Sequence, residues 1–303
     1  MTLTTSVARR RRRRHSLTAR ERWEGWLFAA PTALLVLFVF VVPLALVFVI
    51  AGSDWQLRNG FQGVNLPDNF TEALNLRFLW DSVVFTLKYT VIVTVLLLGI
   101  ALGLALIVQE SSRGKSLLRT AFLLPSALGL ASASLLFYVL YSPLAGPFAG
   151  LMGAWGFTFL GTPDGALWST VFLIVWRFAG FYMLLMLVGL QGIPEEVYEA
   201  ARIDGASVFQ TFRDITLPLL RPTLALTTVL CVTGSLLAFE QFYILTKGGP
   251  DNSTFTVVSL IVNEAFGGTF NLGPAAALSI LVLLALVVIN VLQLRALRNP
   301  DGD

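Results

Sequence analysis

The chain has 303 residues, of which 56% are hydrophobic and 13% are charged, and its mean hydropathy is +0.76. Soluble domains carry about 25% charged residues, so this composition excludes a protein that covers itself with polar surface. Segments of roughly 20 apolar residues can cross a bilayer as helices, which satisfy their own backbone hydrogen bonds there. We therefore predict an all-α, polytopic membrane protein. Its lone cysteine, Cys231, excludes an intrachain disulfide.

Apolar stretches separated by polar connectors predict about six transmembrane helices. We place them at 26–51, 83–108, 120–141, 166–190, 223–245 and 274–294. The first stretch is about twice as long as the apolar region of a secretory signal and lacks a clear cleavage site, so we expect it to be retained. The predicted parts are a basic cytoplasmic tail 1–25, a transmembrane domain 26–298 and a C-terminal cytoplasmic tail 299–303.

Basic residues gather on one side of the membrane if the predicted spans alternate. They are Arg9 to Arg14, Arg20, Arg22, Arg113, Lys115, Arg119, Arg202, Arg213, Arg221, Arg295 and Arg298. The positive-inside rule then places both termini and the loop 191–221 in the cytoplasm. The arginine run also has the composition of a nucleic-acid-binding segment. Orientation of the first helix and contact with anionic lipid explain it sufficiently, so we expect no nucleic-acid partner.

The polar loop at about 194–220 is predicted to begin with a short helix. Pro194 suits a first helical turn, and Glu195 and Glu196 lie where the helix dipole favours negative charge. Gly205, directly after Asp204, can adopt the positive φ that ends a helix. The chain is therefore expected to change direction at Gly205.

A second short helix is predicted after this turn. Ser207 and Gln210 match a capping box, and Pro218 limits how far the helix runs. Apolar residues recur along it at helical spacing, namely Phe209, Phe212 and Ile215. The loop is thus predicted to be a compact cytoplasmic helix pair, a pattern that an ordinary interfacial helix pair shares.

The loop also carries a recognisable motif. Glu199-Ala200-Ala201, Gly205 and Ile215-Thr216-Leu217-Pro218 have the spacing E-A-A-x-x-x-G-x9-I-x-L-P. This resembles the EAA loop by which permease subunits of binding-protein-dependent ABC importers dock on their ATPase. The segments Arg119–Pro125, Gly189–Pro194 and Leu245–Pro250 resemble the carbohydrate-uptake branch. The likeness extends over almost the whole chain and is strongest to the first permease subunit of maltose, glycerol-3-phosphate and related importers.

The resemblance implies a type I ABC importer permease that forms half of a pore in the prokaryotic cell membrane. It implies a second homologous permease, an ATPase dimer that binds ATP and Mg, and an extracytoplasmic solute-binding protein as partners. We expect the external segments 55–80, including Asp68 and Asn69, and 247–272 to meet the binding protein. The resemblance assigns the following residues to ATPase coupling: Glu199, Ala200, Ala201, Asp204, Gly205, Phe209, Ile215, Leu217 and Pro218. Glu199 would meet a basic residue of the ATPase, and the alanines would permit close approach.

Polar and aromatic residues inside the fourth and fifth spans form the predicted substrate pathway, because polar groups in a span are costly and usually face a pathway or a partner. They are Trp176, Arg177, Phe178, Phe181, Tyr182, Ser235, Phe239, Glu240 and Gln241. The resemblance places the family's sugar site near Phe178, Phe181, Ser235 and Ala238. Asparagines of the maltose subunit are not matched, which argues against maltose itself. An Arg177–Glu240 ion pair that locks two helices is an equally weighted alternative to sugar contact.

Nucleotide binding is not expected on this chain, nor is any other cofactor or metal. Gly114-Lys115-Ser116 resembles the end of a phosphate-binding loop. Gln109 stands where the earlier glycine is required, however, and no strand precedes it. We therefore expect ATP hydrolysis on a separate subunit.

Two other classes of protein remain as alternatives to a sugar permease. His15 is the only histidine, and no H-E-x-x-H or G-x-S-x-G motif occurs, so an enzyme is disfavoured. A secondary transporter would usually need internal repeats and coupling carboxylates in the membrane, for which Glu240 alone gives weak support. Within ABC importers, a permease for a non-sugar solute such as glycerol-3-phosphate or a polyamine is the alternative.

Overall fold

The computed structural model describes residues 19–56, 59–110, 112–268 and 270–297. The arginine run, His15, Arg298 and the predicted tail 299–303 lie outside these residues. The chain divides into two compact units, 1–49 and 50–303. The described part of the first unit is one helical run made of α1 (Ala19–Val36), the π-helix η1 (Leu37–Val41) and most of α2 (Val42–Ala51). Pro43 follows the π turn, which accommodates a residue that has no backbone N–H.

The second unit holds the remaining elements. In chain order they are β1 (Ser53–Gln56), β2 (Gly60–Val64), α3 (Leu66–Leu74), α4 (Leu79–Val108), α5 (Arg113–Leu123), η2 (Leu124–Ala127), α6 (Leu130–Leu140), α7 (Ala149–Trp155), α8 (Pro163–Gln191), α9 (Glu195–Ile203), α10 (Val208–Thr211), η3 (Phe212–Thr216), α11 (Leu217–Leu219), α12 (Arg221–Leu236), α13 (Glu240–Leu245), α14 (Val257–Phe266) and α15 (Leu272–Leu297).

Among the described residues, five helical segments are long and apolar enough to cross a membrane. They are Trp26–Ala51, Leu79–Val108, Pro163–Gln191, Arg221–Leu245 and Leu272–Ala296. They coincide, within a few residues, with five of the six predicted ranges. One of them, Arg221–Leu245, corresponds to the predicted fifth span at 223–245. It is not one continuous helix but is interrupted between α12 and α13.

The predicted third span, 120–141, is not a straight helix. The helical segment begins at Arg113, and the chain bends by 91° between Ala127 and Leu130. Pro125 lies in the 3-10 turn η2, and Leu128 and Gly129 are extended, with ψ of 139° and 147°. Proline lacks the N–H that would continue the helix, and the two extended residues redirect it. Hydropathy gives no sign of the bend, because the chain is predominantly apolar on both sides of it, from Ala121 to Leu140.

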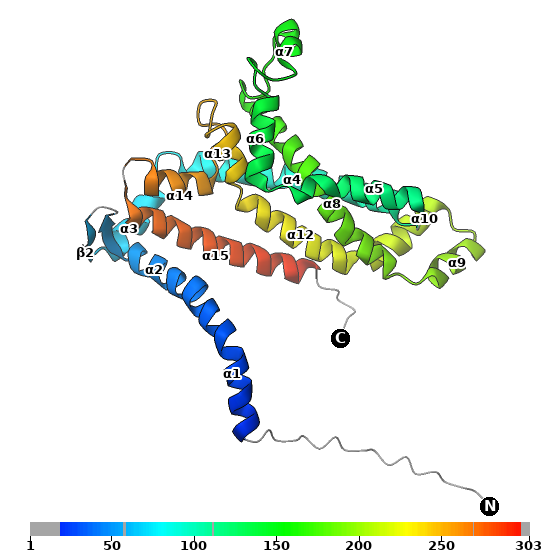
Figure 1. Cartoon of the computed structure of the whole chain (residues 1–303), viewed down its shortest axis with the longest axis horizontal. Coiled ribbons are helices and arrows are strands. Elements are labelled where there is room, and N and C mark those ends of the chain that lie inside the picture. Colours follow the sequence, from blue (N-terminus) through cyan, green and yellow to red (C-terminus); the bar gives the residue numbers. More distant parts are fainter. Residues whose placement is uncertain (1–18, 57–58, 111, 269, 298–303) are drawn as a thin grey trace, which may run out of the picture. The chain divides into compact units, whose positions relative to one another are not determined.

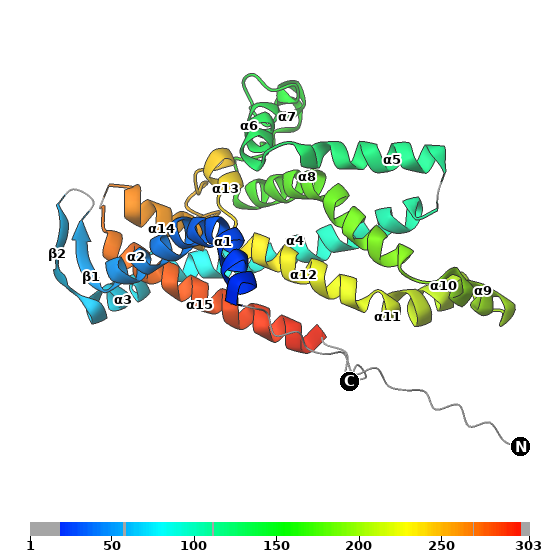
Figure 2. The same ribbon diagram turned by 60° about the horizontal axis from the view of Figure 1, so that its bottom comes forward.

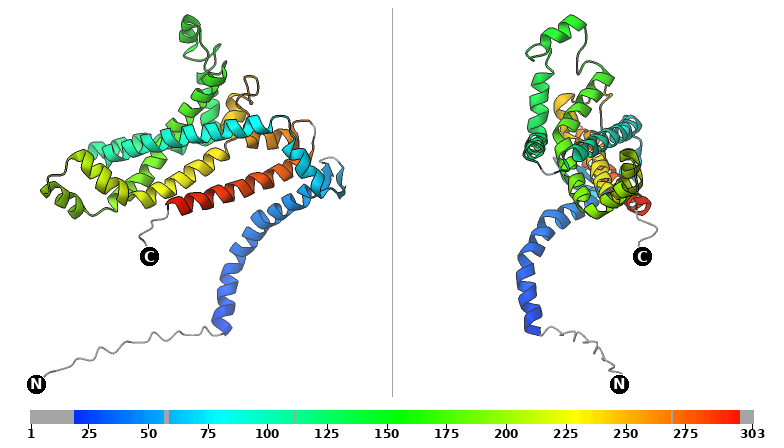
Figure 3. Two further views of the ribbon diagram at one scale, coloured as in Figure 1. Left: turned by 180° about the vertical axis from the view of Figure 1, so that it is seen from behind. Right: turned by 90° about the vertical axis from the view of Figure 1, so that its right-hand side faces the viewer.

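Packing in the second unit centres on α4. Figures 1 and 3 show α4, α12 and α15 running side by side, and α4 also packs along α8. Tyr89, Val93, Leu97, Ala101 and Ala105 are buried at four-residue spacing on one face of α4. The small residues in this stripe permit close helix approach. Helices α9 and α10 lie at one end of this bundle, and β1, β2 and α3 lie at the other (Figure 2).

Asn69 ties together the end of the bundle that carries the strands, which pair antiparallel. Its side chain donates hydrogen bonds to the carbonyl oxygens of Ala51, at 3.0 Å, and Ser53, at 2.9 Å. A Cβ atom on Gly273 of α15 would lie 2.6 Å from Asn69 Oδ1. Asn69 is only 2% exposed. Its contacts within the chain therefore leave little surface for the binding protein that the sequence associates with this segment.

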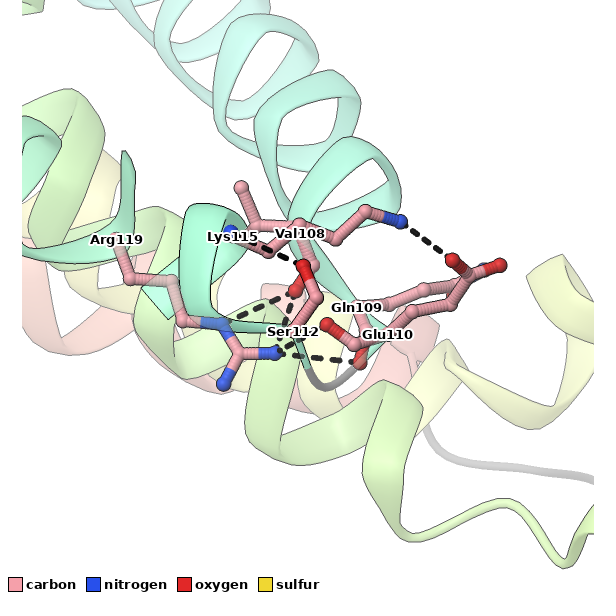
Figure 4. A network of polar contacts seen from close by, with 6 residues as sticks. All are labelled: Val108, Gln109, Glu110, Ser112, Lys115 and Arg119. Atoms are coloured by element: carbon pink, nitrogen blue, oxygen red, sulfur yellow. Dashed lines mark hydrogen bonds and ion pairs between the residues drawn. The ribbon is translucent and has the colours of Figure 1, made fainter. Parts of the chain in front are cut away.

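Arg119 joins α5 to the end of α4 (Figure 4). Its Nε donates to the carbonyl oxygen of Val108 at 3.0 Å, and its terminal nitrogen reaches the carbonyls of Gln109 and Glu110 at 3.3 and 3.2 Å. A helix C-terminus leaves such carbonyls unpaired and partly negative, so a guanidinium is a favourable partner. The hydrogen bond from Lys115 also lowers the pKa of the Glu110 carboxyl.

Replacing Arg119 by alanine is expected to destabilise the folded chain by about 1–2 kcal/mol, because charge-assisted hydrogen bonds to three carbonyls are lost. The melting temperature of the protein in lipid nanodiscs measures the effect. Arg113→Ala is the matched control, since Arg113 is an exposed arginine of the same helix for which the described residues provide no such contact. Equal melting temperatures in the two variants would contradict this role for Arg119.

Candidate functional site

The loop between α8 and α12 folds as predicted into helices joined by a turn. Pro194 is the N-cap of α9, and Gly205 follows the end of that helix with φ +76°. The Gly205 N–H donates to the carbonyl of Arg202 at 3.2 Å. The predicted capping box is confirmed, with Ser207 N to Gln210 Oε1 at 2.8 Å and Gln210 N to Ser207 Oγ at 3.3 Å. We call residues 194–220 the coupling loop, after the role that the sequence predicts for them.

A side-chain contact links the two helical parts of the coupling loop. The hydroxyls of Tyr198 and Thr216 lie 3.3 Å apart and join α9 to η3. Ala201 is buried, at 5% exposed, whereas Glu199 and Ala200 are exposed. Of the EAA residues, Glu199 and Ala200 are therefore accessible to another molecule, and Ala201 is covered by this chain itself.

Large, exposed apolar side chains flank the turn at Gly205. Ile203 is 86% exposed, Val208 is 89% exposed and Phe209 is 69% exposed. Phe212 and Ile215, which were predicted to share a face with Phe209, are half-buried. The sequence reasoning included Phe209 but missed Ile203 and Val208. Their only signal was that they are apolar residues on either side of a glycine turn in a polar segment.

The other predicted coupling residues lie around the turn or where the loop returns to the bundle. Asp204 is the exposed C-cap of α9. Leu217 and Pro218 belong to α11, which follows the π-helix η3 directly. The helical run thus passes through Pro218 and ends at Leu219, and the chain enters α12 at Arg221. Pro218 therefore does not end the helical run, although the run changes from π-helix to α-helix just before it.

Helices α8 and α12 meet where they leave the coupling loop. A Cβ atom on Gly189 would lie 2.3 Å from Thr223 Oγ1 and 2.8 Å from Leu220 Cδ1, and Leu220 is fully buried. A larger residue than glycine has no room at this position. The coupling loop is therefore connected to both helices through a tight joint rather than a flexible connection.

A cavity of about 380 Å³ lies further along α8 and α12, with further walls from α4, α6, α13 and α14. Six predicted pathway residues line it: Phe178, Tyr182, Ser235, Phe239, Glu240 and Gln241. Three predicted residues do not. Trp176 packs against Phe137, with ring centroids 5.2 Å apart, and Phe181 is exposed and lies edge-on to Tyr182.

Arg177, the third of these residues, does not pair with Glu240. The described residues contain no ion pair between them within 4.0 Å, although they interact electrostatically. The Arg177 guanidinium carbon lies instead 4.2 Å from the centroid of the Phe178 ring, a cation–π distance. Its Nε is buried and has no hydrogen-bond partner within the described part of the chain. The ion pair proposed as an alternative lock between the helices is therefore not formed.

The break in the fifth span forms one wall of the cavity. Helix α12 ends at Leu236 and α13 begins at Glu240, and the intervening Leu237, Ala238 and Phe239 line the cavity. Thr256 Oγ1 donates to the carbonyl of Ala238 at 2.8 Å. Irregular backbone at membrane depth is tolerated where it is buried in protein or lines a cavity. Interrupted helices of this kind are typical of solute sites in transporters.

Tyr89, which the sequence reasoning missed, brings α4 into the cavity wall. Its hydroxyl accepts a hydrogen bond from Gln241 Nε2 at 3.2 Å. Gln241 is 3% exposed, and its Oε1 has no partner among the described residues. Tyr89 and Gln241 are 152 positions apart. Local sequence therefore gave no signal that they meet.

A bundle of apolar helices, an interrupted helix beside a cavity and a projecting loop define a membrane transport protein. Residues 95–298 match the family described as "Binding-protein-dependent transport system inner membrane component". This match covers more than half of the chain, so the chain belongs to that family. It is a multi-pass permease of the prokaryotic cell membrane, as predicted, and a transport subunit rather than an enzyme.

Individual relatives extend the match to nearly the whole chain. The trehalose/maltose transport system permease protein MalF of Thermococcus litoralis is 32% identical, over 93% of this chain and 97% of that protein. The lactose transport system permease protein LacF of Rhizobium radiobacter is also 32% identical, over 91% and 94%. A chain of a bacterial alginate ABC transporter, solved with a pentasaccharide-bound periplasmic protein, superposes with a TM-score of 0.79 at 21% identity, over 92% and 95%. Because the sequence identity to the alginate transporter chain is only 21%, that similarity supports the fold alone.

Proposed function

We propose that this chain forms half of the translocation pathway of an ATP-driven importer for a sugar or sugar-like solute. The observation that carries the proposal is that the cavity and the coupling loop share two helices. Phe178 and Tyr182 on α8, and Ser235 on α12, line the cavity, and the same helices continue into the loop through the Gly189 joint. Movement of the loop would therefore tilt the walls of the cavity.

The proposed orientation places the coupling loop and both termini in the cytoplasm. Helix α5 begins, with Arg113, at the end of the bundle that carries α9 and α10 (Figures 1 and 2). Arg202 and Arg213 belong to the loop itself. This concentration of basic residues supports the positive-inside assignment. Counting α5 to α6 as one bent crossing gives six crossings, which returns the chain to the side where it began.

The proposed partner of the coupling loop is a separate ATPase dimer that binds ATP and Mg. Ile203, Val208 and Phe209 form an exposed apolar patch, and Glu199 and Asp204 supply negative charge. A patch of this kind fits an apolar groove with basic residues at its rim. A second homologous permease would complete the pore. An extracytoplasmic binding protein would meet the opposite end, around β1, β2 and the segment 247–272.

A sugar fits the chemistry of the cavity walls. The rings of Phe178, Tyr182 and Phe239 provide apolar faces, and Ser235 and Gln241 provide hydrogen-bonding groups beside them. Sugar rings present C–H faces as well as hydroxyl groups, so they match walls that combine both. The relatives named for trehalose, maltose and lactose transport support a sugar as the solute class.

Replacing Phe178 by alanine is expected to reduce uptake about tenfold, because an aromatic face of the cavity is lost. The assay is uptake of labelled maltose, trehalose and lactose by the importer reconstituted with its cognate subunits. Phe181→Ala is the matched control, since Phe181 lies on the same helix but does not line the cavity. Equal losses in both variants, or none in either, would argue against this cavity as the pathway.

A further inference from the structure

The only charge on the cavity wall, among the described residues, is negative. Among the described residues that line it, Glu240 alone has a side chain that is ordinarily charged at neutral pH. The other ionisable lining residues are Tyr89, Tyr182 and Cys231, which are ordinarily neutral there. Arg177, the only basic residue of helix α8, does not line the cavity and makes no ion pair with Glu240 within 4.0 Å. A solute in the cavity would therefore meet a carboxylate that no lining cation balances, since Arg177 acts on it electrostatically only from outside the wall.

The hydrogen-bonding groups around Glu240 favour the same kind of solute. Gln241 directs its Nε2 to Tyr89, which leaves its buried Oε1 as an acceptor without a partner in the described chain. The Glu240 carboxylate is an acceptor as well. Arg177, which could have offered donors to an anion, has its guanidinium over the Phe178 ring. The wall thus offers acceptors to a solute that carries O–H or N–H donors.

We infer that Glu240 makes this cavity select neutral or positively charged solutes and exclude anionic ones. Resting on the proposed function, this narrows the sugar class to neutral sugars or amino sugars and excludes uronates and phosphate esters. A phosphate or carboxylate would add negative charge beside Glu240, and like charges repel at this close range. Of the two non-sugar alternatives, glycerol-3-phosphate is excluded and a polyamine is compatible with the charge.

Cys231 allows the charge selectivity to be measured without knowing the solute. It lines the cavity and is the only cysteine of the chain. The full-length protein in nanodiscs is treated with 2-aminoethyl methanethiosulfonate, which is a cation, or 2-sulfonatoethyl methanethiosulfonate, which is an anion. Each rate of thiol modification is divided by that reagent's rate with 2-mercaptoethanol. Cys231→Ser, which has no thiol, gives the background.

The wild-type protein is expected to react about tenfold faster with the cation than with the anion after this correction. Glu240→Gln, which keeps the shape of the side chain, should bring the ratio close to one. Asp81→Asn is the matched control, because Asp81 is an exposed carboxylate outside the cavity wall, and it should keep the wild-type ratio. Equal corrected rates in the wild-type protein, or an unchanged ratio in Glu240→Gln, would overturn the inference.

Protection of Cys231 separates this inference from the proposed function. Methyl α-D-glucoside, D-glucosamine, D-glucuronate and spermidine are each added before the cationic reagent. Protection by the first two but not by glucuronate supports both proposals. A wild-type ratio that depends on Glu240, with protection by spermidine alone or by none of the four, supports charge selection and counts against a sugar. Protection by glucuronate as strong as that by methyl glucoside overturns charge selection while leaving the sugar pathway supported.

Discussion

Replacing Gly205 by proline is expected to uncouple ATP hydrolysis from uptake while leaving the complex in the membrane. Gly205 has φ +76°, and its N–H donates to the carbonyl of Arg202. Proline fixes φ near −65° and has no N–H, so it removes both features of the turn. We expect uptake to fall at least about tenfold, because a misdirected coupling loop no longer presents Ile203 and Val208 to the ATPase. Uptake and solute-stimulated ATP hydrolysis are measured on the reconstituted importer.

Gly205→Asn is the matched control for this prediction. No atom lies within 4 Å of a Cβ placed on Gly205, so backbone conformation rather than space decides which residue is accepted. Asparagine tolerates the left-handed region better than other residues with a side chain. It should therefore retain most of the uptake. Normal uptake and normal stimulated hydrolysis in Gly205→Pro would refute the assignment of this loop to coupling.

Glu199→Lys tests the same loop through charge instead of backbone. Glu199 is exposed, so lysine is accommodated without a packing cost and the expected loss of coupling reports on the partner. Ala201 is a poor position for such a test, because it is buried and a larger residue there would disturb the packing of this chain itself.

Local rules allowed most of the coupling loop to be predicted from the sequence. Pro194, Gly205 and the Ser207–Gln210 pair each act over a few residues, and the structure has the helix start, turn and cap that they indicate. The exposure of Ile203 and Val208 was not predictable in the same way. It depends on how α9 and η3 pack against each other through Tyr198 and Thr216.

The candidate cavity was predictable in its helices but not in its shape. Hydropathy located the fourth and fifth spans and their polar residues, yet it averages over the break at Leu237–Phe239 and the bend before Leu130. Both irregular segments are apolar, and their conformations depend on contacts with distant segments. Thr256 supports the first, and Tyr89 reaches the cavity from a helix far away in the sequence.

Gly180 of α8 lies against the backbone of α5 just before the bend, and replacing it by alanine is expected to be strongly destabilising. A Cβ atom there would lie 2.0 Å from the carbonyl oxygen of Phe122 and 3.0 Å from the Cα atom of Leu123. These are backbone atoms, which cannot rotate away as a side chain can. Overpacking of this kind costs about 1–3 kcal/mol or more. The melting temperature in nanodiscs is expected to fall accordingly.

Gly103→Ala is the matched control, because Gly103 also lies inside a long helix but has open space around its Cα. Alanine has a higher helix propensity than glycine by up to about 1 kcal/mol, so this variant should melt at the same or a slightly higher temperature. Gly180 lies between Phe178 and Tyr182 of the cavity wall. The added methyl group in Gly180→Ala is therefore expected to shift these two wall residues and so to change the rate at which Cys231 is labelled. Gly103→Ala should leave that rate unchanged. If the two variants melt and label alike, the close contact between α8 and the bend is not a feature of the folded protein.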